Sequence, residues 1–168
     1  MNKIGIFYSF NTTKTGQAVK MLVEALGREN VELINAETAN EEQILSCDNM
    51  IFGVPTWFDG ELPNYWDEFV PALEDMNLKG KRIAIFGNGN QKNYPENFVD
   101  GIGIMADLLE ARGAKIVGFT AIEGYHFESS RALRGDKFAG LALDFENQPR
   151  QNKERTGKWA EQLKKEFL

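Results

Sequence analysis

The sequence predicts an α/β fold in three layers, α/β/α, with a five-stranded parallel sheet in the order 2-1-3-4-5. Two observations support this prediction. Five short apolar runs lack polar alternation, as in strands that are covered on both faces, and a segment with helical periodicity follows each of them. Right-handed crossovers then place such strands in one parallel sheet between helices. The length of 168 residues predicts a single domain, residues 1–168.

The first strand is predicted at residues 4–8 and is followed by a hydroxyl-rich loop and a helix. That helix places Ala18, Leu22 and Leu26 on one stripe and ends at Gly27. A polar loop between a buried strand and a helix N-terminus is typical of an anion site, because free N–H groups and the helix dipole face the ligand. A plain capped helix explains this loop equally well. The chain has no Walker P-loop.

The second strand is predicted at residues 31–34. Thr38 and Glu41 then have the spacing of a capping box, which would open a short helix with Ile44 facing inward. Cys47 is the only cysteine and is interpreted as a small hydrophobe near a helix end. Because one cysteine cannot form an internal disulfide, the sequence favours a reducing compartment, the cytoplasm.

The third strand, residues 50–54, enters a polar loop that carries Trp57, and a helix with Trp66 and Leu73 inward leaves it. An isolated Trp would more often serve the core. The fourth strand, residues 83–86, ends in a glycine-containing loop that is followed shortly by Tyr94. Residues 101–106 fit the dinucleotide pattern G-x-G-x-x-A, but they do not follow a strand, so the match is attributed to chance.

The fifth strand is predicted to begin at residues 115–120, to be interrupted by an insertion from about residue 121 to 140, and to resume at 141–143. The last helix, from about residue 153, buries Trp159, Leu163 and Phe167. His126 lies in the insertion. It is the only histidine, so a metal-ligating role is not expected.

The three polar loops follow the first, third and fourth strands, which are neighbours in the predicted order. The switch point of such a sheet lies between the first and third strands, where open α/β sheets bind their ligands. One crevice should therefore receive the hydroxyl-rich loop, Trp57 and Tyr94. A flat ligand with a phosphate tail would fit there. No Cys, His or Ser–base pair is placed for nucleophilic chemistry, so a cofactor would have to carry the reaction.

Three motifs at these loops are similar to those of one family. They are Phe10-Asn11-Thr12-Thr13-Lys14-Thr15, Pro55-Thr56-Trp57 with Gly60-Glu61-Leu62, and Gly89-Asn90-Gln91 with Tyr94. With this spacing the chain resembles the flavodoxins over nearly its whole length, and residues 124–127 and 140–144 resemble the insertion of the long-chain type. Phe10 and Thr13 depart from the family's phosphate loop, which has a hydroxyl residue and a glycine there, and Asn90 stands where the family usually has Asp.

The resemblance implies a flavodoxin-like fold, bound FMN, and a low-potential single-electron carrier that is not an enzyme and uses no metal. Such a protein would shuttle electrons between a reductase and an acceptor redox protein. The resemblance also implies that the Phe58–Asp59 peptide flips with the redox state, in a predicted turn of residues 57–60. The flipped, type II form of this turn requires φ > 0 at Asp59. The cofactor-binding residues predicted on this basis are Ser9, Phe10, Asn11, Thr12, Thr13, Lys14, Thr15, Pro55, Thr56, Trp57, Phe58, Asp59, Gly60, Asn88, Gly89, Asn90, Tyr94 and Asn97.

The charge balance bears on the partners. With 25 acidic and 19 basic residues the net charge is −6, which disfavours nucleic acid and anionic membranes and favours a basic redox partner, such as a flavodoxin or ferredoxin reductase. No apolar run could span a membrane, and the start of the chain shows no signal-peptide pattern. A monomer is expected. The acids in or just after the two flavin loops are Asp59, Glu61, Asp67, Glu68, Glu96 and Asp100.

Two other functions are compatible with the predicted fold. An FMN-dependent quinone or nitro-compound reductase would need an open substrate pocket beside the flavin, and usually a dimer to build it. A phosphorylated receiver domain needs an Asp at the end of the third strand and a Lys at the end of the fifth. Here Val54 leads into Pro55-Thr56, and the fifth strand runs through Phe119-Thr120, so the receiver interpretation is weak.

Overall fold

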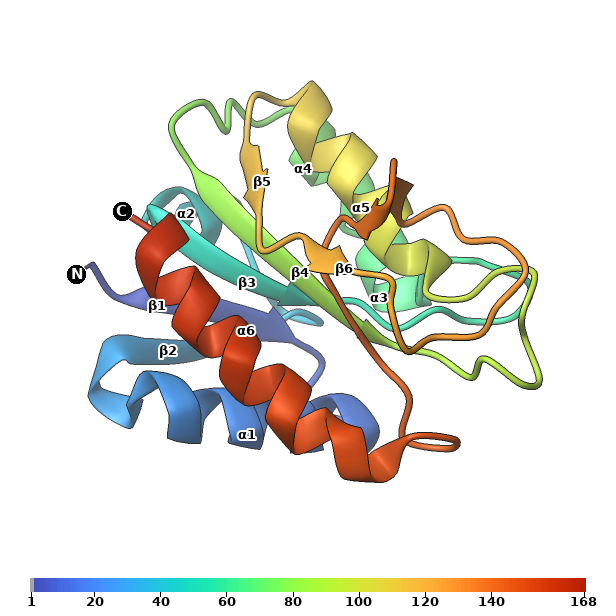
Figure 1. Ribbon diagram of the computed structural model, residues 1–168. Coiled ribbons are helices and arrows are strands. Elements are labelled where there is room, and N and C mark those ends of the chain that lie inside the picture. Colours follow the sequence, from blue (N-terminus) through green and yellow to red (C-terminus); the bar gives the residue numbers. More distant parts are fainter. Residues whose placement is uncertain (1) are drawn as a thin grey trace.

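The computed structural model describes residues 2–168 and arranges them in three layers around a parallel sheet (Figure 1). The strand order β2-β1-β3-β4-β5 confirms the prediction. The five strands are β1 (Ile4–Tyr8), β2 (Val31–Asn35), β3 (Asn49–Gly53), β4 (Arg82–Asn88) and β5 (Lys115–Val117). All the pairs along this path are parallel, and β1 lies between β2 and β3, so the sheet reverses its direction of growth at β1.

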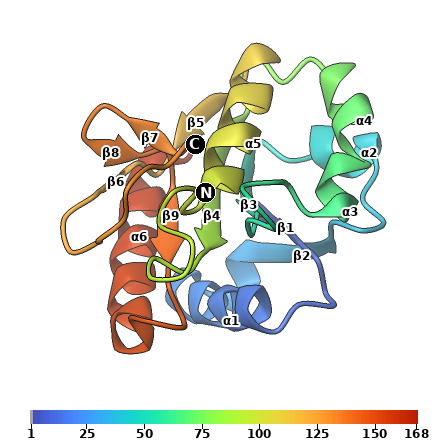
Figure 2. The ribbon, with the colours of Figure 1, turned by 90° about the vertical axis from the view of Figure 1, so that its right-hand side faces the viewer.

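Helices cover both faces of the sheet. On one face α1 (Lys14–Leu26) and α6 (Asn152–Glu166) lie side by side (Figures 1 and 2), and Leu22 and Trp159 are buried there. The other face carries α2 (Glu41–Leu45), α3 (Asn64–Asp67), α4 (Val70–Glu74) and α5 (Asp100–Ala111). The helix predicted around Trp66 and Leu73 is thus two short helices. Pro71 lies in the first turn of α4, where a residue without an N–H is tolerated.

The interrupted fifth strand is confirmed. β5 pairs with the first half of β4, and β9 (Leu141–Leu143) pairs with Phe86–Asn88 in its second half. The insertion between them holds a small antiparallel sheet of β6 (Thr120–Ala121), β8 (Lys137–Phe138) and β7 (Leu133–Arg134). Strands of two residues are too short to show a period in the sequence, so this sheet was not predicted.

The glycines of the rejected dinucleotide motif have a packing role. Gly103 lies within α5, and a Cβ there would lie 2.0 Å from the carbonyl oxygen of Arg131 in the insertion. The missing side chain lets the insertion approach the helix closely. A motif inside a helix does not have the strand–loop–helix context of a dinucleotide site, so its rejection agrees with the structure.

One helix start differs from the prediction. The Asn40 side chain accepts a hydrogen bond from the Gln43 N–H at 2.9 Å, and the Gln43 side chain accepts one from the Asn40 N–H at 3.1 Å. The capping box of α2 is therefore Asn40–Gln43, and the prediction of Thr38–Glu41 is wrong. An Asn at the N-cap is as favourable as a Ser or Thr, which the Ser/Thr pattern overlooks.

Short 3-10 turns at Arg28–Asn30 and Pro149–Gln151 precede β2 and α6. Cys47 is buried, and His126 is exposed. Residues 2–168 contain no group of three or more His, Cys, Asp or Glu side chains placed to hold a metal ion. In the same residues no helix combines the length and the apolarity that a membrane span requires.

Candidate functional site

The carboxyl ends of β1, β3 and β4 bring the three predicted loops together. Two adjacent cavities of about 300 and 210 Å³ lie there and share Thr56, Gly89, Asn90 and Tyr94 as walls. Trp57, Phe58 and Asn97 complete the predicted lining of the first cavity, and Lys14 and Asn88 line the second. Nine of the predicted residues therefore meet at the switch point of the sheet, where ligands of open α/β sheets bind.

Four further residues line these cavities and were missed: Phe98, Val99, Phe145 and Glu146. Phe145 and Glu146 directly follow β9, so extending the strand-end argument to the resumed fifth strand would have found them. Val99 has φ of 49°, in the left-handed region that a β-branched residue rarely adopts. No sequence signal indicates that strain.

The loop after β3 is a tight hairpin between Trp57 and Glu61. The N–H of each residue donates to the carbonyl oxygen of the other at 2.8 Å. The closing bonds join Trp57 to Glu61, one residue beyond the predicted four-residue turn of residues 57–60, and Phe58 and Asp59 lie in the turn as predicted. Positive φ angles occur at Phe58 (50°) and Gly60 (89°) and not at Asp59. Phe58 is 75% exposed, so its side chain does not compensate for the strained backbone by burial.

Asp100 lies against this hairpin and is buried, which corrects its prediction as a surface acid. One of its carboxylate oxygens accepts the Arg131 N–H at 2.7 Å, and a Cβ on Gly60 would lie 2.6 Å from the other. Burial raises the pKa of the Asp100 carboxyl, against a smaller opposing effect of the Arg131 N–H bond. The Thr56 hydroxyl oxygen accepts the N–H of Gly101, which ties the hairpin to the first turn of α5.

The loop after β4 is held by side-chain amides and one carboxylate. Asn90 Oδ1 accepts the Asn93 N–H at 3.0 Å and the Asn147 amide at 2.8 Å, and its carbonyl oxygen accepts the Tyr94 N–H at 2.9 Å. Asp144 is fully buried and accepts two hydrogen bonds from Gln91 at 3.0 Å. These contacts join the loop to the segment after β9 and leave the Tyr94 ring half exposed.

The loop after β1 uses its hydroxyl groups internally. Ser9 donates to Glu37 at 2.9 Å and accepts the Asn11 N–H, Thr12 donates to the Ser9 carbonyl oxygen, and Thr15 donates to Asn88 at 3.1 Å. By contrast, the backbone N–H groups of residues 12–16 have no acceptor within residues 2–168. These unpaired amides at the N-terminus of α1 are the donors available to an anion. Thr13 provides no side-chain cap for the helix.

The remaining predicted residues do not line the two cavities. Phe10, Thr12 and Thr13 line a separate groove beside α1. The others support the loops from outside the cavity walls: Ser9, Asn11, Thr15, Pro55, Asp59 and Gly60. Lys14 forms an ion pair with Glu146 across the second cavity, so its ammonium group joins the β1 loop to the segment after β9.

Comparison with known proteins identifies the family. The flavodoxin family model matches residues 6–159. The chain belongs to the flavodoxin family. It is 40% identical to a flavodoxin of Klebsiella pneumoniae over 98% of this chain and 94% of the relative, and 39% identical to flavodoxin 1 of Escherichia coli K12 over 97% and 93%. The solved structure of Fusobacterium nucleatum flavodoxin bound to flavin mononucleotide superposes with a TM-score of 0.94, at 36% identity and full coverage of both chains.

Family membership decides between the functions that the sequence left open. Flavodoxins are electron-transfer flavoproteins rather than substrate-converting enzymes. The predicted fold class and the absence of enzymatic turnover therefore stand, and redox partners of some kind are implied. The reductase and receiver-domain interpretations are not retained.

Proposed function

We propose that the chain binds one FMN at the carboxyl ends of β1, β3 and β4 and carries single electrons at low potential. The observation that supports this most directly is the pair of adjacent cavities between Trp57 and Tyr94, next to a loop whose backbone donors are unpaired. The Fusobacterium nucleatum relative, similar over its full length, is bound to flavin mononucleotide. When bound, FMN supplies the redox chemistry.

The residues present fit the two ends of this cofactor. The N–H groups of residues 12–16, at the positive end of α1, would hold the phosphate. The Ser9 hydroxyl is not available to the phosphate, because it donates its hydrogen bond to the Glu37 carboxylate. Trp57 and Tyr94 would flank the ring by aromatic stacking. The cofactor-binding residues predicted between Ser9 and Asn97 are thus proposed to act in two ways. Some form the walls of the two cavities, and the others belong to the loops that hold these walls in place.

A titration and a reduction experiment test the proposal. FMN should bind to the cofactor-free protein with one site, and riboflavin should bind weaker by about tenfold or more, because it lacks the phosphate. Stepwise reduction followed by visible absorption should show two separate one-electron steps. Equal binding of FMN and riboflavin would remove the phosphate site, and a single two-electron step would contradict the carrier function.

We also propose that the protein acts as a monomeric single domain, 1–168, and docks on a basic reductase and an acceptor redox protein. Five of the six predicted acids are exposed beside the flavin loops: Asp59, Glu61, Asp67, Glu68 and Glu96. Exposed charges steer association, so the association rate should fall steeply as salt rises. Glu61→Gln with Glu68→Gln should flatten this salt dependence, whereas Glu29→Gln, on the turn before β2, should leave it unchanged. A rate indifferent to salt contradicts the proposal.

The proposed location is the cytoplasm, where electron-carrier partners of this kind would be met. The chain has one cysteine and it is buried and free, which suits a reducing compartment. Sedimentation of the FMN-loaded protein would test the monomer, and limited proteolysis would test the single domain.

A further inference from the structure

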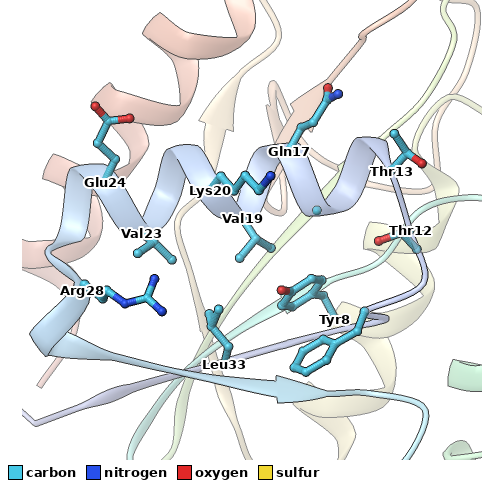
Figure 3. A pocket seen from close by; sticks show the side chains of 12 residues that line it. Tyr8, Thr12, Thr13, Gln17, Val19, Lys20, Val23, Glu24, Arg28 and Leu33 are labelled. Atoms are coloured by element: carbon cyan, nitrogen blue, oxygen red, sulfur yellow. The ribbon is translucent and has the colours of Figure 1, made fainter.

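A cavity larger than either flavin-site cavity lies between α1 and the edge strand β2. Its volume is about 650 Å³, against about 300 Å³ for the first cavity at the switch point. Figure 3 shows this groove with the helix on one side and Leu33 of β2 on the other. Small-molecule sites typically have volumes of about 300 to 1,000 Å³, and the volume of this groove lies in that range. Its lining is mixed, with an aromatic and aliphatic part and a polar and charged part.

The floor of the groove is aromatic and aliphatic. Tyr8 and Phe10 lie with ring centroids 5.0 Å apart, and Val19, Val23 and Leu33 continue the apolar surface. Phe10 is 50% exposed although it has a half-buried aromatic neighbour. Phe10 therefore adds exposed apolar surface to the wall of the groove.

The two departures from the flavodoxin phosphate loop both belong to this groove. Phe10 and Thr13 line it, and neither lines the cavities at the switch point. Both positions at which this loop departs from the family pattern thus border a groove that is separate from the two cavities at the switch point.

Two basic side chains, Lys20 and Arg28, bring positive charge to the groove. Neither Lys20 nor Arg28 forms a side-chain hydrogen bond or an ion pair with any residue from 2 to 168. The Arg28 guanidinium points along the groove toward Leu33, the Tyr8 hydroxyl points toward the same space, and the carboxylate of Glu24 points away (Figure 3). In a protein of net charge −6, an apolar groove bounded by two unpaired cations has a local charge opposite to that of the whole molecule.

We propose that this groove binds a small organic carboxylate with a flat apolar body. Arg28 would hold the carboxylate through two parallel N–H bonds, a geometry that guanidinium provides and ammonium does not. Tyr8 and Phe10 would pack against the body, and Lys20 would add charge at the rim. The groove shares Thr12, Thr13 and Gly16 with the loop proposed to hold the phosphate, but it includes no residue of the loops after β3 and β4. The ligand would therefore bind beside the flavin and not in place of its ring.

The experiment uses 2-naphthoate as the probe and the FMN-loaded protein. Calorimetric titration should show one naphthoate site, and amide chemical shifts should change along α1 and β2. The uncharged 2-naphthamide has the same shape and should bind weaker by about tenfold, since a charge-assisted bond is lost. Arg28→Ala should weaken naphthoate by a similar factor, and Leu33→Trp, which fills the groove, should abolish it.

The controls separate this site from folding and from the flavin. Arg150→Ala removes an exposed arginine that does not line the groove and should leave naphthoate binding within about twofold of the parent. Both groove variants should keep their FMN affinity and melting temperature. If the protein proves not to bind FMN, the same titration on the flavin-free chain still tests the groove.

Three results would overturn the proposal. Equal affinity for naphthoate and naphthamide would show that the cations do not select an anion. An unchanged affinity in Arg28→Ala, or shift changes confined to the flavin loops, would place the probe elsewhere. Concentration-dependent dimerisation that Leu33→Trp abolishes would show that a second copy of the chain covers the groove instead.

Discussion

Replacing Asp144 with Asn should destabilise the protein strongly although the two side chains have the same shape. Asp144 is fully buried and accepts five hydrogen bonds. One oxygen accepts three of them, two from Gln91 and one from the Asn147 side chain, and the other accepts the N–H groups of Glu146 and Asn147. An Asn amide can keep only one of these oxygens as an acceptor.

The size of the destabilisation follows from the orientation of the Asn side chain that loses fewer hydrogen bonds. If the Asn oxygen faces the three donors, its NH₂ group meets the two backbone N–H groups that lost their acceptor. An unsatisfied buried donor costs about 1–3 kcal/mol, and these two donors are only partly buried, so each should cost about 1 kcal/mol and Asp144→Asn should lower the free energy of unfolding by about 2 kcal/mol. For a domain with a total of roughly 5–15 kcal/mol this is a substantial fraction, and it corresponds to a fall of about 1 M in the urea midpoint.

Urea unfolding of the flavin-free protein, followed by circular dichroism, measures this directly. The matched control is Asp136→Asn, at an exposed aspartate of the insertion, which should change the free energy of unfolding by less than about 0.5 kcal/mol. FMN affinity should also fall in Asp144→Asn, because Gln91 joins Asp144 to the loop that carries Tyr94. A loss below about 0.5 kcal/mol would refute the hydrogen-bond accounting.

Four further predictions concern the loops. Trp57→Ala and Tyr94→Ala should each weaken FMN about tenfold, from lost stacking and area; unchanged affinity in both by fluorescence titration would exclude the sandwich. Asp59→Gly should raise the first one-electron potential and Asp59→Val should lower it, since the flipped peptide needs φ > 0 there; equal potentials would exclude the flip. Asn90→Asp should lower the second potential by on the order of tens of millivolts through charge repulsion, as its two donors can still bond the carboxylate; no shift, or a rise, would count against a charge effect. Phe58→Gly should not destabilise the chain by urea unfolding, because relief of a left-handed φ worth about 1 kcal/mol offsets the flexibility of Gly; a loss of more than about 0.5 kcal/mol would show that the exposed ring makes stabilising contacts.

The sheet could be predicted because burial on both faces leaves a direct record in the sequence. Apolar runs such as residues 4–8 and 83–86 have no polar alternation, and the polar loops after them had to meet at one edge once the strand order was set. Only the loops after the first, third and fourth strands were considered, so Phe145 and Glu146, which follow the resumed fifth strand β9, were not predicted.

Other features depend on contacts that no local pattern reveals. In the sequence Asp100 is one acidic residue among several. In the structure it is buried, and its carboxylate accepts the backbone N–H of Arg131, which is distant in the chain. The Trp57 hairpin closes at Glu61 through paired backbone bonds that are independent of side-chain type. The groove beside α1 depends on how the helix packs beside the edge strand, which sequence spacing does not reveal.

The insertion has a structural consequence for the flavin loops. Arg131 of the insertion donates to Asp100, which lies against the Trp57 hairpin, and the His126 N–H donates to Gln91 at 2.6 Å in the loop after β4. The insertion therefore contacts the supports of both loops that would flank the ring, without lining either cavity itself. Since hydrogen bonds to buried groups restrict movement, the insertion should hold the two loops at a fixed separation. In this chain the segment that interrupts the fifth strand thus acts on the flavin site through positioning contacts rather than through contact with the ligand.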